Sequence, residues 1–271
     1  MAADTPVAEL FSLEGRVAVV TGAGSGLGRV FSLTLAEAGA AVVAADLDAE
    51  AANETARIIQ SRGGAARAVD VNVAEVASVE RLAETVRDWH TSVQVLVNNA
   101  GISSRAHIVH ELPIEQWDGV IAVNLRGTFL TSRAVLPMML EDRRASIINI
   151  ASVAGVRAMD PGVLSQADYV ASKAGVIGLT LQMAVDYAVA GVRVNAIAPG
   201  WHLGTNLGRR VGNFPTRADQ RRLVEKLAQW TPMRRTGEPA ELRGLVLYLA
   251  SDASSYVTGQ VIAHDGGWLA W

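Results

Sequence analysis

The sequence predicts an α/β fold: a single Rossmann-type, doubly wound parallel sheet with helices on both faces. Six short apolar runs of strand length recur at fairly even spacing, at 17–20, 41–45, 66–69, 93–97, 147–150 and 192–197. Segments with helical periodicity separate or follow them, at 29–38, 49–62, 76–89, 114–140, 169–190 and 239–249. Strands that are apolar throughout must be covered on both faces, which is the condition of a parallel sheet between two helical layers.

The alternation continues past residue 190 without a linker or a change of composition, so residues 15–271 are expected to form one domain after a loosely held lead-in at 1–14. Asp48 is a suitable N-cap for the second helix, and Pro239 lies in the first turn of the last one. Long irregular stretches often carry function. We therefore expect a substrate loop and lid within about 199–236.

Composition limits the possible functions. The chain has 271 residues, 50% of them hydrophobic, no cysteine and a net charge of −3. It can bury a large core, and the lack of cysteine excludes thiol catalysis and cysteine-ligated zinc. Without a basic stripe, a long apolar segment or a signal peptide, we expect a cytoplasmic protein that binds neither nucleic acid nor membrane. The histidines show no metal-ligand spacing, so no catalytic metal is expected.

A glycine-rich turn from Thr21 to Gly28 (TGAGSGLG) joins the first strand to the first helix. Glycines permit positive φ and a close approach of the backbone to a pyrophosphate, and the helix N-terminus offers unpaired N–H groups to that anion. An ordinary tight turn in a protein rich in alanine and glycine is the alternative. The residues of this turn expected to bind a dinucleotide are Gly22, Gly24, Ser25, Gly26, Leu27 and Gly28.

Asp46 ends the second strand, where a carboxylate can accept hydrogen bonds from both hydroxyls of the adenosine ribose. Helix capping is the alternative role, but Asp48 is better placed for it. A carboxylate at this position repels a 2′-phosphate, and Ser25 stands where a phosphate-binding arginine could have been. Both features predict NAD rather than NADP.

Two further strand ends offer cofactor contacts. Asp70 and Val71 end the third strand, where they could meet the adenine edge, although a simple strand-end turn explains them equally well. In such sheets the ligand lies where the winding direction reverses, between the first and fourth strands. The residues directly after the fourth strand expected to contact the cofactor are Asn99, Ala100 and Gly101.

Tyr169 and Lys173 open a long helix, and their spacing puts the phenol and the ammonium on one face. A nearby cation favours phenolate, so we expect a lowered tyrosine pKa and a role as general acid/base. A half-buried tyrosine beside a surface lysine is the alternative; however, the chain has only two lysines, Lys173 and Lys226. Ser152, at the end of the fifth strand, could hydrogen-bond a substrate oxygen, although serine there is more often a turn residue.

In this order, the glycine turn, the Asn98–Gly101 segment (NNAG), Ser152, the Tyr169–Lys173 pair and Pro199-Gly200 resemble a short-chain dehydrogenase/reductase. The resemblance runs from about residue 12 to the C-terminus. It implies that Tyr169 transfers the substrate proton, that Ser152 holds the substrate oxygen and that Lys173 binds the nicotinamide ribose. Asn124, in the segment VNLRGT, matches the fourth catalytic position of the family, which holds a water of the proton relay.

The chain departs from the family pattern at two places. The segment from Ser152 to Tyr169 is longer than usual, so Ser165 is a rival for the serine role. An extra residue precedes Thr205, which leaves open whether His202 or Leu203 meets the nicotinamide carboxamide. Besides Tyr169 and Lys173, the later cofactor contacts expected from the resemblance are Pro199, Gly200, His202 and Thr205.

We therefore expect an NAD-dependent alcohol dehydrogenase/ketone reductase. The substrate pocket is expected to include Ser103, Ala154, Leu164, Trp201 and His202. Residues 10–13 and 265–271 resemble sugar-acid members such as gluconate 5-dehydrogenases, and the family implies a homotetramer that buries the last strand and helix. A 3-ketoacyl-thioester reductase usually prefers NADPH, which Asp46 disfavours, and a non-catalytic dinucleotide sensor would not keep all four catalytic positions.

Overall fold

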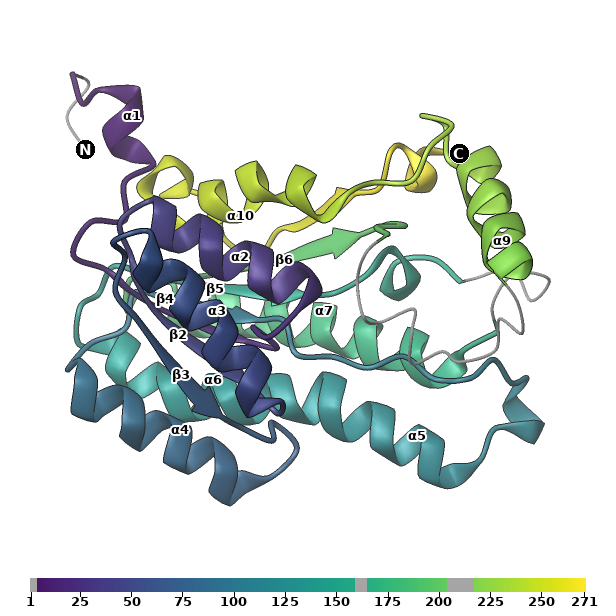
Figure 1. Ribbon diagram of the computed structural model, residues 1–271, viewed down its shortest axis with the longest axis horizontal. Helices are drawn as coiled ribbons and strands as arrows, with labels where there is room; N and C mark the ends of the chain where they lie inside the picture. Colours follow the sequence, from purple (N-terminus) through teal and green to yellow (C-terminus); the bar gives the residue numbers. More distant parts are fainter. Residues whose placement is uncertain (1–3, 159–164, 204–216) are drawn as a thin grey trace.

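The structure, a computed structural model, describes residues 4–158, 165–203 and 217–271, without the side chains of 217–220. Within these residues, seven strands form one sheet in the order β3-β2-β1-β4-β5-β6-β7 (Figure 1). Every neighbouring pair is parallel. The strands are β1 (Val17–Thr21), β2 (Ala41–Asp46), β3 (Ala66–Asp70), β4 (Val95–Asn98), β5 (Ala145–Ile150), β6 (Val192–Pro199) and β7 (Val261–His264). The predicted doubly wound parallel sheet is confirmed.

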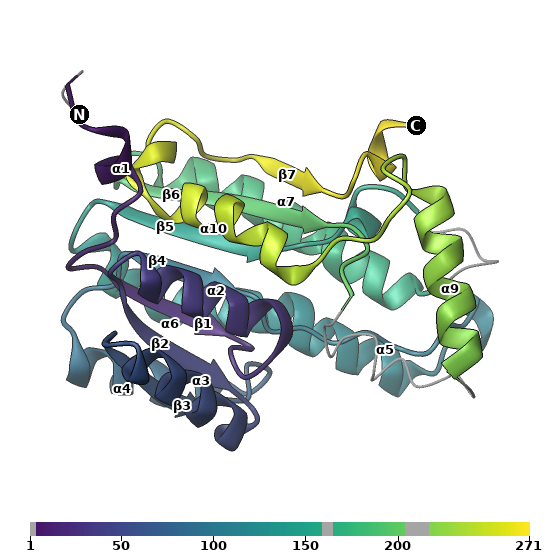
Figure 2. The ribbon, with the colours of Figure 1, turned by 45° about the horizontal axis from the view of Figure 1, so that its top comes forward.

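Helices cover both faces of the sheet. The described α-helices are α1 (Val7–Leu10), α2 (Gly26–Glu37), α3 (Ala49–Ser61), α4 (Val76–Trp89), α5 (Ile114–Ile121), α6 (Gly127–Leu140), α7 (Ala167–Tyr187), α9 (Arg217–Trp230) and α10 (Arg243–Ala250). One apolar core joins the sheet to α2, α3 and α10, and the other joins it to α4, α6 and α7 (Figure 2). No described helix is both long and apolar enough to cross a membrane.

Three details differ from the sequence-based expectation. Strand β7 was not among the predicted runs, because this edge strand is only partly buried and its apolar part is only three residues long, Val261 to Ala263. The expected helix 114–140 contains a π-helical segment, Ala122–Arg126, between α5 and α6. The last helix starts as a 3₁₀ turn, Pro239–Leu242, that leads into α10. The predicted N-cap is confirmed, since Asp48 accepts a hydrogen bond from the Ala51 N–H.

The register of the sheet brings the motif-bearing strand ends to one rim. Asp46 pairs with Asp70 across β2 and β3, and Asn98 pairs with Asn149 across β4 and β5. Strand order reverses between β1 and β4, and the helices that follow them leave on opposite faces. A crevice at the carboxyl end of the sheet follows from this topology.

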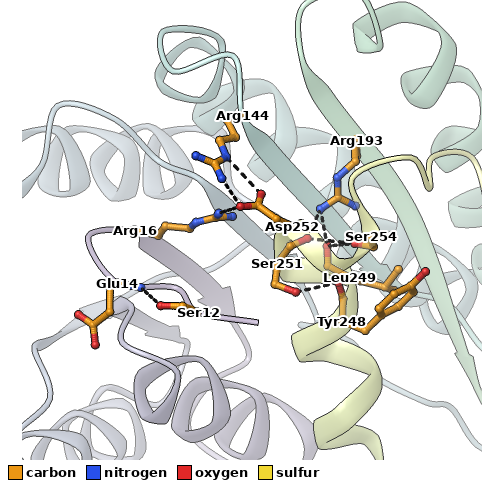
Figure 3. Close-up of polar contacts among 10 residues, drawn as sticks. All are labelled: Ser12, Glu14, Arg16, Arg144, Arg193, Tyr248, Leu249, Ser251, Asp252 and Ser254. Carbon is orange, nitrogen blue, oxygen red and sulfur yellow. Dashed lines mark hydrogen bonds and ion pairs between the residues drawn. The ribbon is translucent and has the colours of Figure 1, made fainter. Parts of the chain in front are cut away.

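A polar cluster at the opposite rim fixes the end of α10 to the sheet (Figure 3). Asp252, just after α10, accepts a hydrogen bond of 2.6 Å from Arg16, which precedes β1, and pairs with Arg144, which precedes β5. Arg193 of β6 donates to the carbonyls of Leu249 and Ser251. These bonds satisfy carbonyls at the C-terminus of α10, which have no partner within the helix.

We expect Asp252→Asn to destabilise the fold at neutral pH. Burial acts to raise the pKa of Asp252, but the hydrogen bonds and charges of Arg144 and Arg16 outweigh it, so the pKa lies below its ordinary value. The contribution is therefore present above about pH 4 and is lost as the pH falls through the lowered pKa. Urea unfolding should show a loss of about 1–3 kcal/mol at pH 7, and a smaller loss at pH 3.

Glu50→Gln is the matched control, because Glu50 pairs with Arg57 at a site where both side chains are largely exposed. Exposed ion pairs contribute little. Equal losses for the two variants at pH 7 would contradict the role assigned to the Asp252 cluster.

Candidate active site

A cleft of about 400 Å³ opens at the carboxyl rim of the sheet. The predicted residues that line it are Gly22, Gly24, Ser25, Gly26, Leu27, Asp46, Val71, Asn99, Ala100, Gly101, Ser152, Tyr169, Lys173, Pro199, Gly200 and His202. Neighbours of these motifs that the sequence analysis did not single out, such as Leu47, Asn72 and Ile102, line it as well. Their only signal was proximity to a motif, because none has a distinctive chemistry.

The glycine turn is pressed against the segment that follows β4. Gly22 has φ +66° and Gly26 has φ +52°, and a Cβ on Gly28 would lie 2.0 Å from the Gly22 carbonyl oxygen. A Cβ on Gly22 would lie 2.9 Å from the Ala100 Cα. Gly28 therefore lies beneath the turn and not in the cleft lining. Only glycine fits at these positions, which explains the spacing of the motif.

Hydrogen bonds lock the turn to the end of β4. The Thr21 hydroxyl oxygen accepts from the N–H groups of Asn99 and Ala100, each at 3.1 Å, and the Asn99 amide donates to the Thr21 carbonyl at 2.9 Å. Ser25, the N-cap of α2, makes no side-chain capping bond. First-turn N–H groups without a capping side chain bind an anion such as a pyrophosphate, so this cradle fits a dinucleotide.

The Asp46 carboxylate is held in the cleft beside the glycine turn. It accepts a hydrogen bond of 2.7 Å from the Gly24 N–H and one of 3.0 Å from the Asp48 N–H. A Cβ on Gly24 would lie 2.9 Å from one carboxylate oxygen. Asp70, its neighbour in β3, is exposed and lies outside the cleft lining, whereas Val71 is part of it.

At the other end of the cleft, Tyr169 and Ser152 both line the wall. Burial raises the pKa of Tyr169 to about 12, and the Ser152 hydroxyl acts to lower that pKa but opposes burial only in part. The Lys173 ammonium donates to the Ile150 carbonyl at 2.7 Å and lies 5.7 Å from the centre of the Tyr169 ring. Burial also lowers the pKa of Lys173 to about 8.

The expected lowering of the tyrosine pKa is therefore wrong for this structure. Lys173 is directed at the Ile150 carbonyl, and the burial of Tyr169 outweighs the lowering of its pKa by Ser152. Of the two candidate serines, Ser152 lines the cleft, while the carbonyl of Ser165 accepts from the His107 N–H. The geometry thus favours Ser152 over Ser165.

Asn124 lies in the π-helical segment and is fully buried behind the cleft. Its side-chain oxygen accepts from the Ile102 N–H at 2.8 Å, and its amide donates to the Ile102 carbonyl and to Ser172. Gly101 lies between Asn124 and Lys173, since a Cβ there would be 3.4 Å from the amide oxygen and 3.5 Å from the ammonium. Asn124 therefore supports the backbone beside Lys173.

The expected substrate residues are dispersed. Ser103 accepts a hydrogen bond from Gln166, Ala154 is only 2% exposed, and neither lines the cleft. Trp201 lines a second cavity, of about 560 Å³, which shares His202 with the cleft. Leu164 lies outside the described residues. So do residues 204–216 of the expected loop and lid, which include Thr205. Among the described residues, no group of three or more acidic, histidine or cysteine side chains could hold a metal.

The C-terminal tail packs on its own chain. Trp268 is buried and meets Trp201 edge to face, with ring centres 6.4 Å apart. The guanidinium of Arg157 lies 5.5 Å from the Trp268 ring centre and also contacts the Trp271 carbonyl. The two tail tryptophans are thereby tied to the segment that follows Ser152.

Comparison with known proteins agrees with this geometry. A protein-family model described as enoyl-(acyl carrier protein) reductase matches residues 22–269. The solved structure of a short-chain type dehydrogenase/reductase from Mycobacterium marinum superposes with a TM-score of 0.89 at 35% identity, covering 97% of this chain and 99% of that one. The chain belongs to the short-chain dehydrogenase/reductase family, and the predicted resemblance is confirmed.

Relatives of this chain include enzymes with different named substrates. A 3-oxoacyl-[acyl-carrier-protein] reductase from Thermotoga maritima is 40% identical over 94% of this chain and 98% of its own length. A gluconate 5-dehydrogenase from Burkholderia cenocepacia, solved in complex with NADP and tartrate, is 35% identical with a TM-score of 0.89. The alignment with that structure covers 98% of this chain and 100% of the other. The protein is thus an oxidoreductase of this family.

We expect Lys173→Met to stabilise the fold while it removes activity. A buried lysine whose pKa falls from about 10.5 to about 8 makes the folded state bind its proton less tightly, so stability rises with pH across that interval. At pH 7 the charged form is a cost, and its removal should raise the free energy of unfolding by roughly 1–2 kcal/mol.

Urea unfolding at pH 7, 8 and 10 measures this effect, with Lys226→Met as the control at the other lysine. The Lys173 variant should lose the rise in stability between pH 8 and 10, and the control should keep it. A Lys173→Met protein that is less stable than the wild type at pH 7, with an unchanged pH dependence, would show that burial does not destabilise the charged form of Lys173.

Proposed function

We propose that the protein is an NAD(H)-dependent oxidoreductase that moves a hydride between nicotinamide and a secondary alcohol or ketone, with Tyr169 as general acid/base. The observation that carries the proposal is the convergence of Tyr169 and Ser152 in one cleft, with buried Lys173 one helical turn from Tyr169. All three line the same cleft as the glycine turn. Membership of the family supports the same reaction class.

The residues at this end of the cleft have different roles in the transfer of the proton. The cofactor, when bound, donates or accepts the hydride at its nicotinamide ring. Ser152 holds the substrate oxygen beside Tyr169. A pKa near 12 keeps the phenol protonated at neutral pH, ready to donate during ketone reduction. Alcohol oxidation requires the phenolate, which positive charge in the cleft favours. We assign to Lys173 the ribose contact and to Asn124 the support of a relay water.

The preference for NAD rests on Asp46. Two backbone N–H groups hold its carboxylate in the cleft, where a 2′-phosphate would be repelled. Arg29, close to the same turn, donates to the Gly24 carbonyl and pairs with Glu54. Its guanidinium is therefore paired within the protein and is not directed at a 2′-phosphate. The B. cenocepacia neighbour was solved with NADP, and we propose the opposite preference for this chain on the strength of this carboxylate.

The substrate class follows from weaker observations. The gluconate 5-dehydrogenase neighbour and the similar chain ends support a sugar acid as the alcohol. Acyl-thioester reduction is the second candidate, because the T. maritima relative is named for it and because Arg221 and Arg222 are exposed on α9, where they could attract an anionic carrier. Turnover assays with gluconate-type acids and with acetoacetyl thioesters separate the two.

We also propose a homotetramer in the cytoplasm that acts on a small molecule and binds neither nucleic acid nor membrane. Leu181, Val185 and Val189 are 47%, 76% and 90% exposed. Their spacing of four residues puts them in one stripe along and just beyond α7. An exposed apolar stripe of this kind suits burial against a second copy of the chain.

We expect Tyr169→Phe to reduce turnover by about a hundredfold or more while NADH binding changes little, because only the transferable proton is lost. Stopped-flow or steady-state NADH absorbance gives the rate, and calorimetric titration gives the affinity. Tyr187→Phe, on the same helix but outside the cleft, should behave as the wild type. Normal turnover by the Tyr169 variant would remove the basis of the proposed chemistry.

Asp46→Asn should shift the cofactor preference toward NADP. Loss of the negative charge relieves repulsion of the 2′-phosphate, so the ratio of kcat/KM for NAD to that for NADP should fall by about tenfold, equivalent to 1.4 kcal/mol. Asp48→Asn, which keeps an N-capping side chain in the same cleft, should leave the ratio nearly unchanged. A wild-type protein that uses NADP better than NAD would contradict the assignment.

A further inference from the structure

The segment Gly200–Leu203, where β6 ends, lines the cofactor cleft through Gly200 and His202, and hydrogen bonds hold it on two sides. On one side the Gly200 N–H donates to the His264 carbonyl at 3.0 Å. On the other side the Gly237 N–H donates to the Trp201 carbonyl at 2.8 Å, and the Leu203 N–H donates to the Gly237 carbonyl at 3.1 Å. The position of this segment therefore depends on the end of β7 and on the loop before α10.

A pair of histidines adds a side-chain link to these backbone bonds. Nδ1 of His202 lies 3.2 Å from the Gly200 carbonyl oxygen, and Nε2 of His202 lies 3.1 Å from Nδ1 of His264. A carbonyl oxygen can only accept, so Nδ1 of His202 carries a proton and its Nε2 in the neutral ring is an acceptor. His264 must then donate from Nδ1.

Both nitrogens of His202 are thus used within the protein. Its ring also packs against Gly237, where a Cβ would lie 2.7 Å from Nε2. His202 cannot turn toward a substrate without breaking one of these contacts, which revises the expectation that it serves as a polar substrate contact. Its role in the cleft is to shape the wall.

We propose that His264 is a positioning residue that holds His202, and through it the Gly200–Leu203 segment, against the nicotinamide end of the cofactor cleft. The proposal rests on the proposed dinucleotide site. His264 itself lines the second cavity and not the cleft, so its effect on the cofactor passes through His202.

The tautomers predict how the pair responds to acid. On the His264 side the charged groups lining the cavity are Arg235, Glu241 and Asp265. Those lining the cleft are Asp46, Asp48 and Lys173, beside the neutral phenol of Tyr169. A proton on Nε2 of His202 would break the link, because that nitrogen could then no longer accept from His264. Burial lowers the pKa of His202, which favours the neutral ring that the link requires.

Two variants at His264 separate the hydrogen bond from the bulk of the ring. His264→Asn can donate its amide to Nε2 of His202, whereas His264→Leu cannot. We expect the Leu variant to bind NADH about three- to tenfold more weakly than the wild type, as for the loss of one net hydrogen bond. The Asn variant should stay within about twofold. ADP-ribose, which lacks the nicotinamide, should bind all three proteins equally in calorimetric titrations.

The outcomes distinguish the positioning role from the cofactor site. Equal NADH affinity for the wild type and the Leu variant overturns the role of His264 alone, and so does an equal loss of NADH and ADP-ribose binding. A wild-type protein that binds neither ligand overturns the site as well. If the Leu variant fails to fold, ¹⁵N NMR of the wild-type histidines decides: His202 protonated on Nε2 and not on Nδ1 contradicts the proposal.

Discussion

The buried ammonium of Lys173 is the constraint on which the candidate site depends. It is 4% exposed and donates to the Ile150 carbonyl at the end of β5. A desolvated charge is unfavourable unless it is paired, and here burial lowers the lysine pKa to about 8 while it raises that of Tyr169 to about 12. The two shifts have the same main cause, since burial disfavours the charged form of each group. The site therefore holds a protonated phenol beside an ammonium that binds its proton weakly.

Topology explains why these groups lie beside a dinucleotide cradle. The reversal of strand order between β1 and β4 opens the crevice. Hydrogen bonds between Thr21 and Asn99 join the ends of these two strands at its base. Glycine at 22 and 28 lets two backbone segments meet at distances that a side chain would prevent. Asn124, in a π-helical turn, supports the backbone at Ile102. At the far rim the Asp252 cluster anchors α10 without contributing to the cleft.

Much of this could be predicted from sequence because it depends on local patterns. Apolar runs gave the central strands, and the spacing of glycines, of Tyr169 and Lys173, and of Asp46 placed the cleft. Strand β7 was missed, since this partly exposed edge strand has an apolar run of only three residues. The sign of the Tyr169 pKa shift was wrong because burial, which depends on the tertiary fold, outweighs the lowering by Ser152. The link between His202 and His264 joins residues far apart in the sequence, so no spacing rule could reveal it.

A crystal structure of the NADH complex tests the central claim most directly. The account predicts a dinucleotide lying across Gly22 to Gly28, with its ribose hydroxyls on Asp46 and its nicotinamide beside Tyr169. The phenol oxygen should remain within hydrogen-bond reach of Ser152, about 2.6–3.2 Å, and the Lys173 ammonium should contact the nicotinamide ribose. A dinucleotide bound elsewhere, or a nicotinamide remote from Tyr169, would contradict the account.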